Sequence, residues 1–172
     1  SATLIAKDRE SAFLQRLYTT PLRARDVILG YTLPLIPISL AQTLICYLLA
    51  FALKLPCSIG VLYAIIGIIP VSVLFISIGL LCGSILSVKQ AGGICGALLT
   101  NLSAWLSGVW FDLELVGGAF MSIPRALPFY HAVAMERALL KADFATAMSH
   151  FPILAIYAAA LSALAIVLFT AQ

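Results

Sequence analysis

Residues 59–86 read IGVLYAIIGIIPVSVLFISIGLLCGSIL, an uncharged and almost wholly apolar run. A helix needs roughly 20 apolar residues to cross the hydrocarbon core of a bilayer, so this run is long enough to span a membrane. Gly79 and Gly83 lie four residues apart, a spacing that lets a second helix approach closely. Pro70 falls inside the run, and we expect a hinge there because proline removes one backbone hydrogen bond of a helix.

The composition of the whole chain is typical of a membrane protein. Of its 172 residues, 63% are hydrophobic and 10% are charged, and the mean hydropathy is +1.11. Soluble domains carry about 25% charged residues, which excludes an ordinary water-soluble fold. The length predicts one membrane domain over residues 1–172, without room for a separate soluble domain. The net charge of +3 is too small to indicate a nucleic-acid partner.

Further apolar segments flank this run on both sides. Those long enough to span are residues 21–53, 92–111 and 151–170. The sequence therefore predicts an all-α integral membrane protein with about four transmembrane helices. Pro34 and Pro37 are predicted kinks in the first of these segments. Residues 112–150 combine charges and prolines with apolar runs too short to cross, so we expect an outer re-entrant or interfacial segment with a helix at about 129–141.

Charge returns in an ordered way in the stretch KDRESAFLQRLYTT at residues 7–20. Its apolar residues recur at three- and four-residue spacing, which predicts an amphipathic helix with the charged residues on its other faces. Thr20 and Pro21 are typical of the start of the next helix. Basic residues cluster beside the first span, so the stretch is predicted to be cytoplasmic. By pattern alone it is either an anchor on the lipid surface or the contact site of a soluble partner.

The ionisable residues argue against chemistry inside the membrane. Residues 27–111 contain no His, Asp or Glu, which argues against an intramembrane enzyme and against an ion-coupled transporter. The four cysteines form no C-x-x-C pair and no phosphate-binding loop is present, so we predict no catalytic, cofactor-binding or metal-binding residues. His131, Glu136 and Asp112 are interpreted as structural pairs at the outer surface, because His131 and Glu136 are turned about 140° apart on a helix. Alternatively, Glu136 or Arg137 pairs with the ends of neighbouring spans.

Polar side chains within the spans are candidates for a transport pathway, because a polar group in lipid is costly unless it meets a partner or water. The candidates are Ser39, Gln42 and Asn101. A hydrogen bond between two helices is the competing and simpler explanation for each of them.

Three motifs, in order, resemble the type-2 permeases of ATP-binding-cassette exporters. RESAFLQRL at residues 9–17, followed by TTP at 19–21, is similar to the cytoplasmic loop of that family. LSGVWF at 106–111 is similar to its Leu-Ser-Gly and aromatic motif at the outer end of the fifth helix. ALPFYHAV at 126–133, with Arg137 downstream, is similar to its Leu-Pro motif. The resemblance covers nearly the whole chain, as spans three to six of a six-span permease, and we expect the N-terminal spans to be missing.

The resemblance implies that a separate ATPase subunit binds and hydrolyses ATP, so no cofactor is expected on this chain. A second permease subunit, identical or different, would complete the pathway in the lipid bilayer. The protein would be a multi-pass protein of the plasma membrane that exports a hydrophobic or amphipathic substrate such as a drug, lipid or peptide. The residues implied to couple to the ATPase are Arg9, Glu10, Phe13, Leu14, Arg16, Leu17 and Tyr18. The hinges implied for alternating access are Pro34, Pro37 and Pro70. The alternative is a secondary transporter or channel-like protein with a merely interfacial amphipathic helix.

Overall fold

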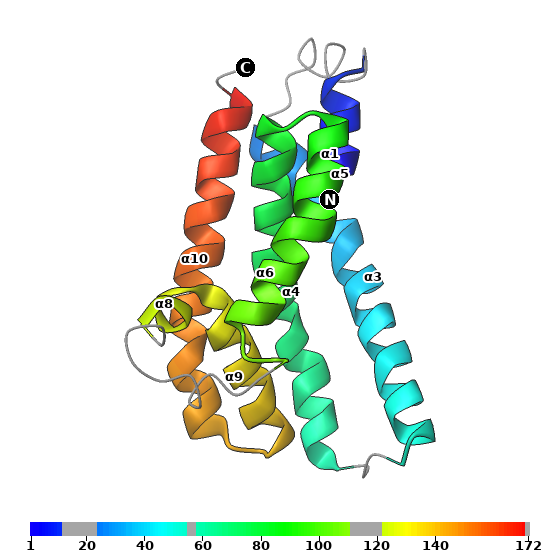
Figure 1. Ribbon diagram of the computed structural model, residues 1–172, viewed down its shortest axis with the longest axis vertical. Coiled ribbons are helices and arrows are strands. Elements are labelled where there is room, and N and C mark those ends of the chain that lie inside the picture. Colours follow the sequence, from blue (N-terminus) through cyan, green and yellow to red (C-terminus); the bar gives the residue numbers. More distant parts are fainter. Residues whose placement is uncertain (12–23, 55–57, 111–121, 171–172) are drawn as a thin grey trace.

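The protein is built from helices in the computed structural model, which describes residues 1–11, 24–54, 58–110 and 122–170 (Figure 1). Three helices are long and apolar enough to cross a membrane: α3 (Ala24–Ala52), α4 (Ile59–Ile85) and α10 (Phe144–Thr170). No strand occurs in these described ranges. The prediction of an all-α membrane protein is therefore confirmed.

The span predicted at residues 92–111 is built from three abutting helical segments. These are α5 (Val88–Gly93), the π-helix η1 (Ile94–Leu99) and α6 (Thr100–Leu106). The backbone stays right-handed helical at both junctions, so the three segments form one continuous rod, which we call the rod. At about 1.5 Å per residue the rod rises roughly 28 Å, close to the thickness of a bilayer core. The Thr100 hydroxyl donates to the Cys95 carbonyl oxygen, five residues earlier, at 3.0 Å, the spacing that a π-helix provides.

The last long helix begins earlier than predicted. The span predicted from the sequence covers residues 151–170, whereas α10 begins at Phe144 and continues through Pro152. Asp143 caps its first turn, because one carboxylate oxygen accepts from the Thr146 amide at 3.1 Å and the other from the Thr146 hydroxyl at 2.6 Å. The helix predicted at 129–141 is α9 (Pro128–Leu140), which begins with a proline in its first turn.

The N-terminal helix α1 (Ala2–Arg9) corrects the start of the amphipathic helix predicted at 7–20. Residues 7–9, which were predicted to begin the amphipathic helix, are instead the last residues of α1, and this helix ends at Arg9. The Ser11 hydroxyl donates to the Asp8 carbonyl oxygen at 2.7 Å, a local turn that competes with further helix. The remainder of that predicted helix lies outside the described residues, with Phe13, Leu14, Arg16, Leu17 and Tyr18. Residues 112–121 of the predicted outer segment, including Asp112, also lie outside them.

Helix α4 is the centre of the molecule. Figure 1 shows it between α3 and α10, with α9 beside its lower half and the rod in front. Its buried residues Val71, Leu74 and Ile78 pack in one cluster with residues of α9 and α10. A second cluster joins α4 to α1, α3 and α10 and consists of Ile5, Ile28, Ile76, Leu80 and Ala165. α4 is therefore the element against which the others are positioned.

The close approach predicted at Gly79 and Gly83 is confirmed, and the helix that approaches is α1. A Cβ atom on Gly83 would stand only 2.6 Å from the Ala2 carbonyl oxygen, and one on Gly79 would overlap Ser1. The second pair of glycines, Gly92 and Gly96 on the rod, behaves differently. A Cβ atom there would meet nothing within 4 Å, because both residues border a cavity.

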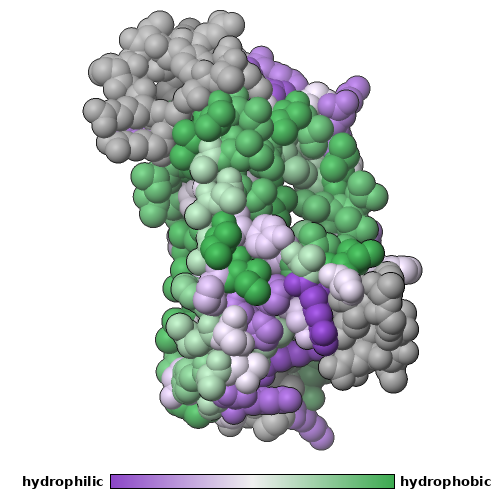
Figure 2. Space-filling view, turned by 90° about the vertical axis from the view of Figure 1, so that its left-hand side faces the viewer, coloured by the Kyte–Doolittle hydropathy of each residue, from purple (hydrophilic) through white to green (hydrophobic). Residues whose placement is uncertain are grey.

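The outer surface of the helices is strongly apolar. Figure 2 shows hydrophobic side chains over the middle of one face and hydrophilic side chains gathered toward its lower end. On α3, Leu33 and Leu49 are each 61% exposed. Exposed leucines at this density fit a helix that faces lipid, in agreement with a membrane-spanning position.

Candidate functional site

Three consecutive charged residues at the end of α1 each contact a different helix. The Tyr31 hydroxyl of α3 donates to the Asp8 carboxylate at 2.7 Å. The Arg9 guanidinium donates to two carbonyl oxygens at the end of α4, those of Ser84 and, at 2.8 Å, Leu86. We call the set of Asp8, Arg9 and Glu10 with these partners the α1 junction.

Glu10 completes the junction at the start of the rod. Its carboxylate accepts from the Val88 amide, the first helical residue of α5, at 3.3 Å. The last carbonyls and the first amides of helices lack partners within the helix, and helix dipoles favour cations at the former and anions at the latter. Arg9 and Glu10 supply these charges in the matching order on the two sides of one turn. α5 is capped further by Ser87 and Gln90, which form a reciprocal capping box.

The α1 junction contains two of the predicted coupling residues, Arg9 and Glu10. The resemblance assigned Arg9 and Glu10 to the rim of an ATPase contact, whereas the structure shows both in hydrogen bonds within the chain. Their partners lie 75 to 78 residues away along the chain, so local sequence gives no sign of them. The role of Asp8 was missed for the same reason.

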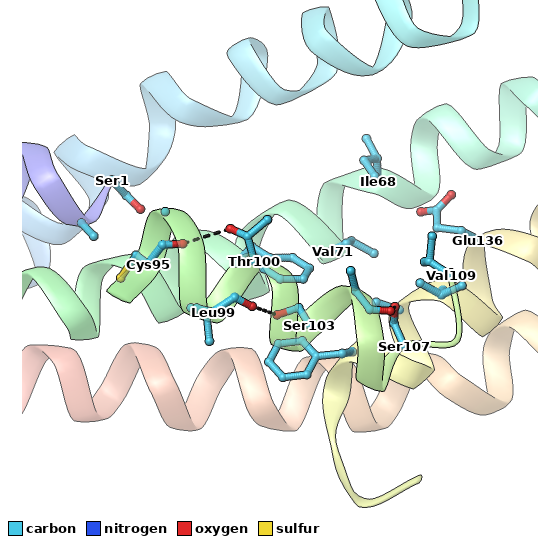
Figure 3. A pocket seen from close by; sticks show the side chains of 18 of the residues that line it. Ser1, Ile68, Val71, Cys95, Leu99, Thr100, Ser103, Ser107, Val109 and Glu136 are labelled. Atoms are coloured by element: carbon cyan, nitrogen blue, oxygen red, sulfur yellow. Dashed lines mark hydrogen bonds between the residues drawn. The ribbon is translucent and has the colours of Figure 1, made fainter. Parts of the chain in front are cut away.

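A cavity of about 690 Å³ lies between α4, α9 and the rod (Figure 3). Its walls are mostly apolar, with Ile68, Val71 and Phe75 from α4 and Phe129 from α9. Ser1 and the first residues of α1 line one end of the cavity, and Figure 3 shows Glu136 at the other end. The helix that carries the α1 junction therefore also borders the cavity.

The rod contributes small and hydroxyl-bearing residues to this cavity, among them Thr100, Ser103 and Ser107. Their hydroxyls are already bonded to the rod's own backbone: that of Ser103, for example, donates to the Leu99 carbonyl oxygen at 2.7 Å (Figure 3). The wall that the rod presents is therefore less polar than its sequence indicates. Periodicity alone did not predict these residues as cavity lining.

The predicted pathway residues lie outside this cavity. Asn101 donates to the Ala97 carbonyl oxygen of its own helix at 2.8 Å and lines a hollow on another part of the rod. Ser39 accepts from the Ser72 hydroxyl at 2.8 Å, which joins α3 to α4 as the competing interpretation expected. Gln42 is exposed and lines, with Ser39, a hollow of about 680 Å³ between α3 and α4. Their part in a pathway stays a prediction.

The hollow between α3 and α4 borders the main cavity. The hollow that contains Ser39 and the main cavity share Ile68, Val71 and Phe75 as lining residues. The predicted hinges lie inside the surrounding helices, Pro34 and Pro37 in α3 and Pro70 in α4. Their function as hinges also stays a prediction.

Glu136 is the residue for which the expected structural pairing is wrong. Its Oε1 atom is buried and has no hydrogen-bond partner among the described residues. Burial raises the pKa of the Glu136 carboxyl to about 7 from an ordinary value of 4.5. Arg137 does pair with the end of a neighbouring span, since its guanidinium donates to the Gly108 carbonyl oxygen at 2.8 Å.

His131 has the structural role that the sequence indicated, with different partners. Its Nε2 lies 2.9 Å from the Arg125 carbonyl oxygen, so Nε2–H is the donor and Nδ1 accepts from His150 Nδ1 at 2.8 Å. This chain of bonds joins the short helix α8 (Ser122–Ala126) and α9 to α10. No group of three or more His, Cys, Asp or Glu that could hold a metal ion occurs in the part of the chain that the structure describes.

The family of this chain follows from comparison with known proteins. A family model described as "ABC-2 family transporter protein" matches residues 1–171. No curated protein and no solved structure matches the chain. The match covers the α1 junction, the long apolar helices and the cavity alike. The chain belongs to the ABC-2 family of transporter proteins, as a permease subunit of an ATP-binding-cassette transporter.

Proposed function

We propose that this permease is the membrane half of an exporter, driven by an ATPase subunit that grips the segment after α1. Membership of the ABC-2 family implies an ATPase partner, and the predicted coupling helix supplies an apolar face for it. The observation that carries the proposal is the α1 junction. The junction connects the end of α1, where that segment begins, to α3, α4 and the rod.

The proposed mechanism is mechanical. When two ATPase subunits close on nucleotide, the segment that follows α1 moves and pulls on α1. Arg9 and Glu10 hold the turn between α4 and α5. That movement therefore reaches α4 and the rod, which are two of the three walls of the cavity. Packed helices respond to such shifts by moving as rigid bodies.

The cavity is the proposed place for the cargo. Ligand pockets commonly have volumes of about 300–1,000 Å³ and mostly apolar walls with a few polar groups, and this cavity has both properties. A hydrophobic or amphipathic molecule is therefore the cargo that it suits. A second permease subunit, identical or different, would enclose the remaining side of the pathway in the plasma membrane.

One observation favours the alternative of a secondary transporter. Glu136 is an ionisable group beside an apolar cavity, and such groups in membrane proteins often carry protons or ions. An ion-coupled carrier would need no ATPase on the segment at 7–20. The dependence of transport on that segment therefore separates the two functions.

The test is co-purification of the permease in detergent with ATP-binding-cassette ATPase subunits of the same organism. We expect the wild type to retain an ATPase and Leu17→Asp to lose it, because the substitution adds a charge to the apolar face. Gln15→Asp adds the same charge to the predicted polar face and should retain the ATPase. The coupling proposal is wrong if the wild type retains no ATPase, or if Leu17→Asp binds as well as Gln15→Asp.

A further inference from the structure

We propose that the cavity between α4, α9 and the rod binds a lipophilic organic cation, whose positive charge is held by the Glu136 carboxylate. This inference rests on the proposed export function and names the chemical class of its cargo. Three features of the structure support it: the missing hydrogen-bond partner of Glu136 Oε1, the aromatic wall of the cavity, and the lack, among the described residues, of the further ligands that a metal ion would need.

The Glu136 carboxylate lacks the compensation that a buried charge normally has. Its Oε1 atom is buried without a hydrogen bond among the described residues. A Cβ atom added to Gly67 of α4 would stand 3.1 Å from that oxygen, so the backbone of α4 lies directly against it. A buried and unpaired carboxylate is costly, and the cost is relieved by a proton or by a bound cation.

The neighbouring arginine does not supply the missing charge. Arg137 follows Glu136 directly, and adjacent residues of a helix do not face each other. Arg137 also lines the cavity, but its guanidinium is engaged with the Gly108 carbonyl oxygen. A positive group from a ligand is thus complementary to this end of the cavity.

The aromatic wall fits the same ligand. Phe75 of α4 and Phe129 of α9 both line the cavity, and their rings stack with centroids 5.8 Å apart and an interplanar angle of 28°. Aromatic faces attract cations, more strongly where water is excluded. Ile68, Val71 and Val133 provide apolar surface for the remainder of a lipophilic molecule.

A hard metal ion fits less well. Ca²⁺ takes six to eight oxygen ligands and Mg²⁺ needs a near-ideal octahedron. Within the described ranges, no cluster of three acidic, histidine or cysteine side chains exists to begin such a shell. An organic cation with a delocalised or shielded charge needs one carboxylate and an apolar enclosure, and the cavity offers both.

The test is equilibrium binding of radiolabelled tetraphenylphosphonium to the permease in lipid nanodiscs, with binding to empty nanodiscs subtracted. Triphenylphosphine oxide, a neutral molecule of similar shape, is measured in parallel. We expect saturable binding of the cation to the wild type. Glu136→Gln should weaken it at least about tenfold, because a buried charge pair loses one partner, and should change binding of the neutral probe less than about twofold.

Two further variants keep the test decisive. Asp143→Asn removes an exposed carboxylate outside the cavity and retains a good helix cap, so it should bind both probes as the wild type does. Val133→Phe fills cavity space and should weaken both probes. The inference is overturned if the wild type shows no saturable binding, or if Glu136→Gln binds the cation as the wild type does. It is also overturned if Asp143→Asn weakens the cation equally, or if Val133→Phe weakens neither probe. Displacement of the probe by millimolar sodium or calcium would assign the carboxylate to an inorganic ion and overturn it as well.

The binding assay contains neither ATPase nor nucleotide, so its outcome is independent of the coupling test. Charge-selective binding without a retained ATPase would preserve the site and refute the exporter. A retained ATPase without charge-selective binding would preserve the exporter and refute this class of cargo.

Discussion

Replacing Gly83 with alanine should loosen the contact between α1 and α4 on which the proposed coupling depends. The added Cβ atom would stand 2.6 Å from the Ala2 carbonyl oxygen, 3.0 Å from the Ile5 Cβ and 3.2 Å from the Ala2 Cα. All three atoms belong to the backbone or branch points of α1, so no side-chain rotation can relieve the overlap. The whole of α1 must move.

The size of the effect follows from these distances. Ordinary van der Waals contact begins at 3.4 Å, so α1 must withdraw by about 0.8 Å from the carbonyl contact. Overpacking of this kind costs about 1–3 kcal/mol, and the higher helix propensity of alanine returns up to about 1 kcal/mol. We expect a net loss of about 1–2 kcal/mol in the free energy of unfolding, or roughly 2–8 °C in Tm for a chain of this size.

The assay is thermal unfolding of the permease in detergent, together with nucleotide-driven transport by its complex with the ATPase. Gly30→Ala on α3 is the matched control, since its Cβ atom would meet nothing within 4 Å. We expect it to behave as the wild type in both measurements, whereas Gly83→Ala should lose stability and transport together. Equal Tm values for the two variants would refute the tight crossing of α1 on α4, and normal transport by a destabilised Gly83→Ala would refute the coupling route through it.

Four further substitutions test the junction, the carboxylate and the helix contacts. Arg9→Gln should cost about 1–3 kcal/mol of unfolding free energy and reduce nucleotide-driven transport while the ATPase stays bound, because the end of α4 loses its cationic donor; loss of ATPase binding in a pull-down would contradict this. Burial raises the pKa of Glu136, so its proton stabilises the fold, and the Tm of the wild type relative to that of Glu136→Gln should fall as the pH rises from 4.5 toward 7, which thermal unfolding at several pH values would measure. His131→Phe should cost about 1–3 kcal/mol in a denaturation experiment, since it leaves the Arg125 carbonyl oxygen and His150 Nδ1 without their hydrogen bonds to the buried imidazole, whereas an unchanged Tm would show that these bonds contribute nothing. Thr146 hydrogen bonds hold the pKa of Asp143 below its usual range, and Asp143→Ala should lower Tm where Asp143→Asn does not, which circular dichroism melting would measure.

Length and apolarity were enough to predict the membrane class and two of the long helices, because both are local properties of the chain. The early start of α10 was missed because the charges and prolines of residues 112–150 indicated an outer segment, although the cap at Asp143 and Thr146 already determines a helix start. A proline inside a membrane helix is tolerated when neighbouring groups satisfy the freed carbonyl. The π-helical part of the rod has no comparable local signal, since Thr100 reaches back five residues only once the helix has widened.

The two parts of the candidate site were least predictable, because both depend on residues far apart in the sequence. Glu136 was expected to pair, yet its Oε1 atom lies beside Gly67 of α4, which has no side chain to offer a partner. The resemblance implied an ATPase contact for Arg9 and Glu10, whereas their hydrogen bonds run to the turn between α4 and α5. Motif resemblance predicted the family without predicting either arrangement.

The way α1 is held makes α4, rather than α3, the helix through which force would reach the cavity. Ile5 and Ala6 of α1 are buried, and Gly83 of α4 lies against the backbone of Ala2 and the Cβ atom of Ile5, so a shift of α1 at this point cannot be absorbed by rotamer changes. α3 is different: most of its surface faces outward, and its hydrogen bonds to other helices include those of Tyr31 with Asp8 and of Ser39 with Ser72. A displacement at the α1 junction should therefore carry α4 and the start of the rod along and let α3 slide. This motion would change the space between α4, α9 and the rod, which is the space that the proposed cargo occupies.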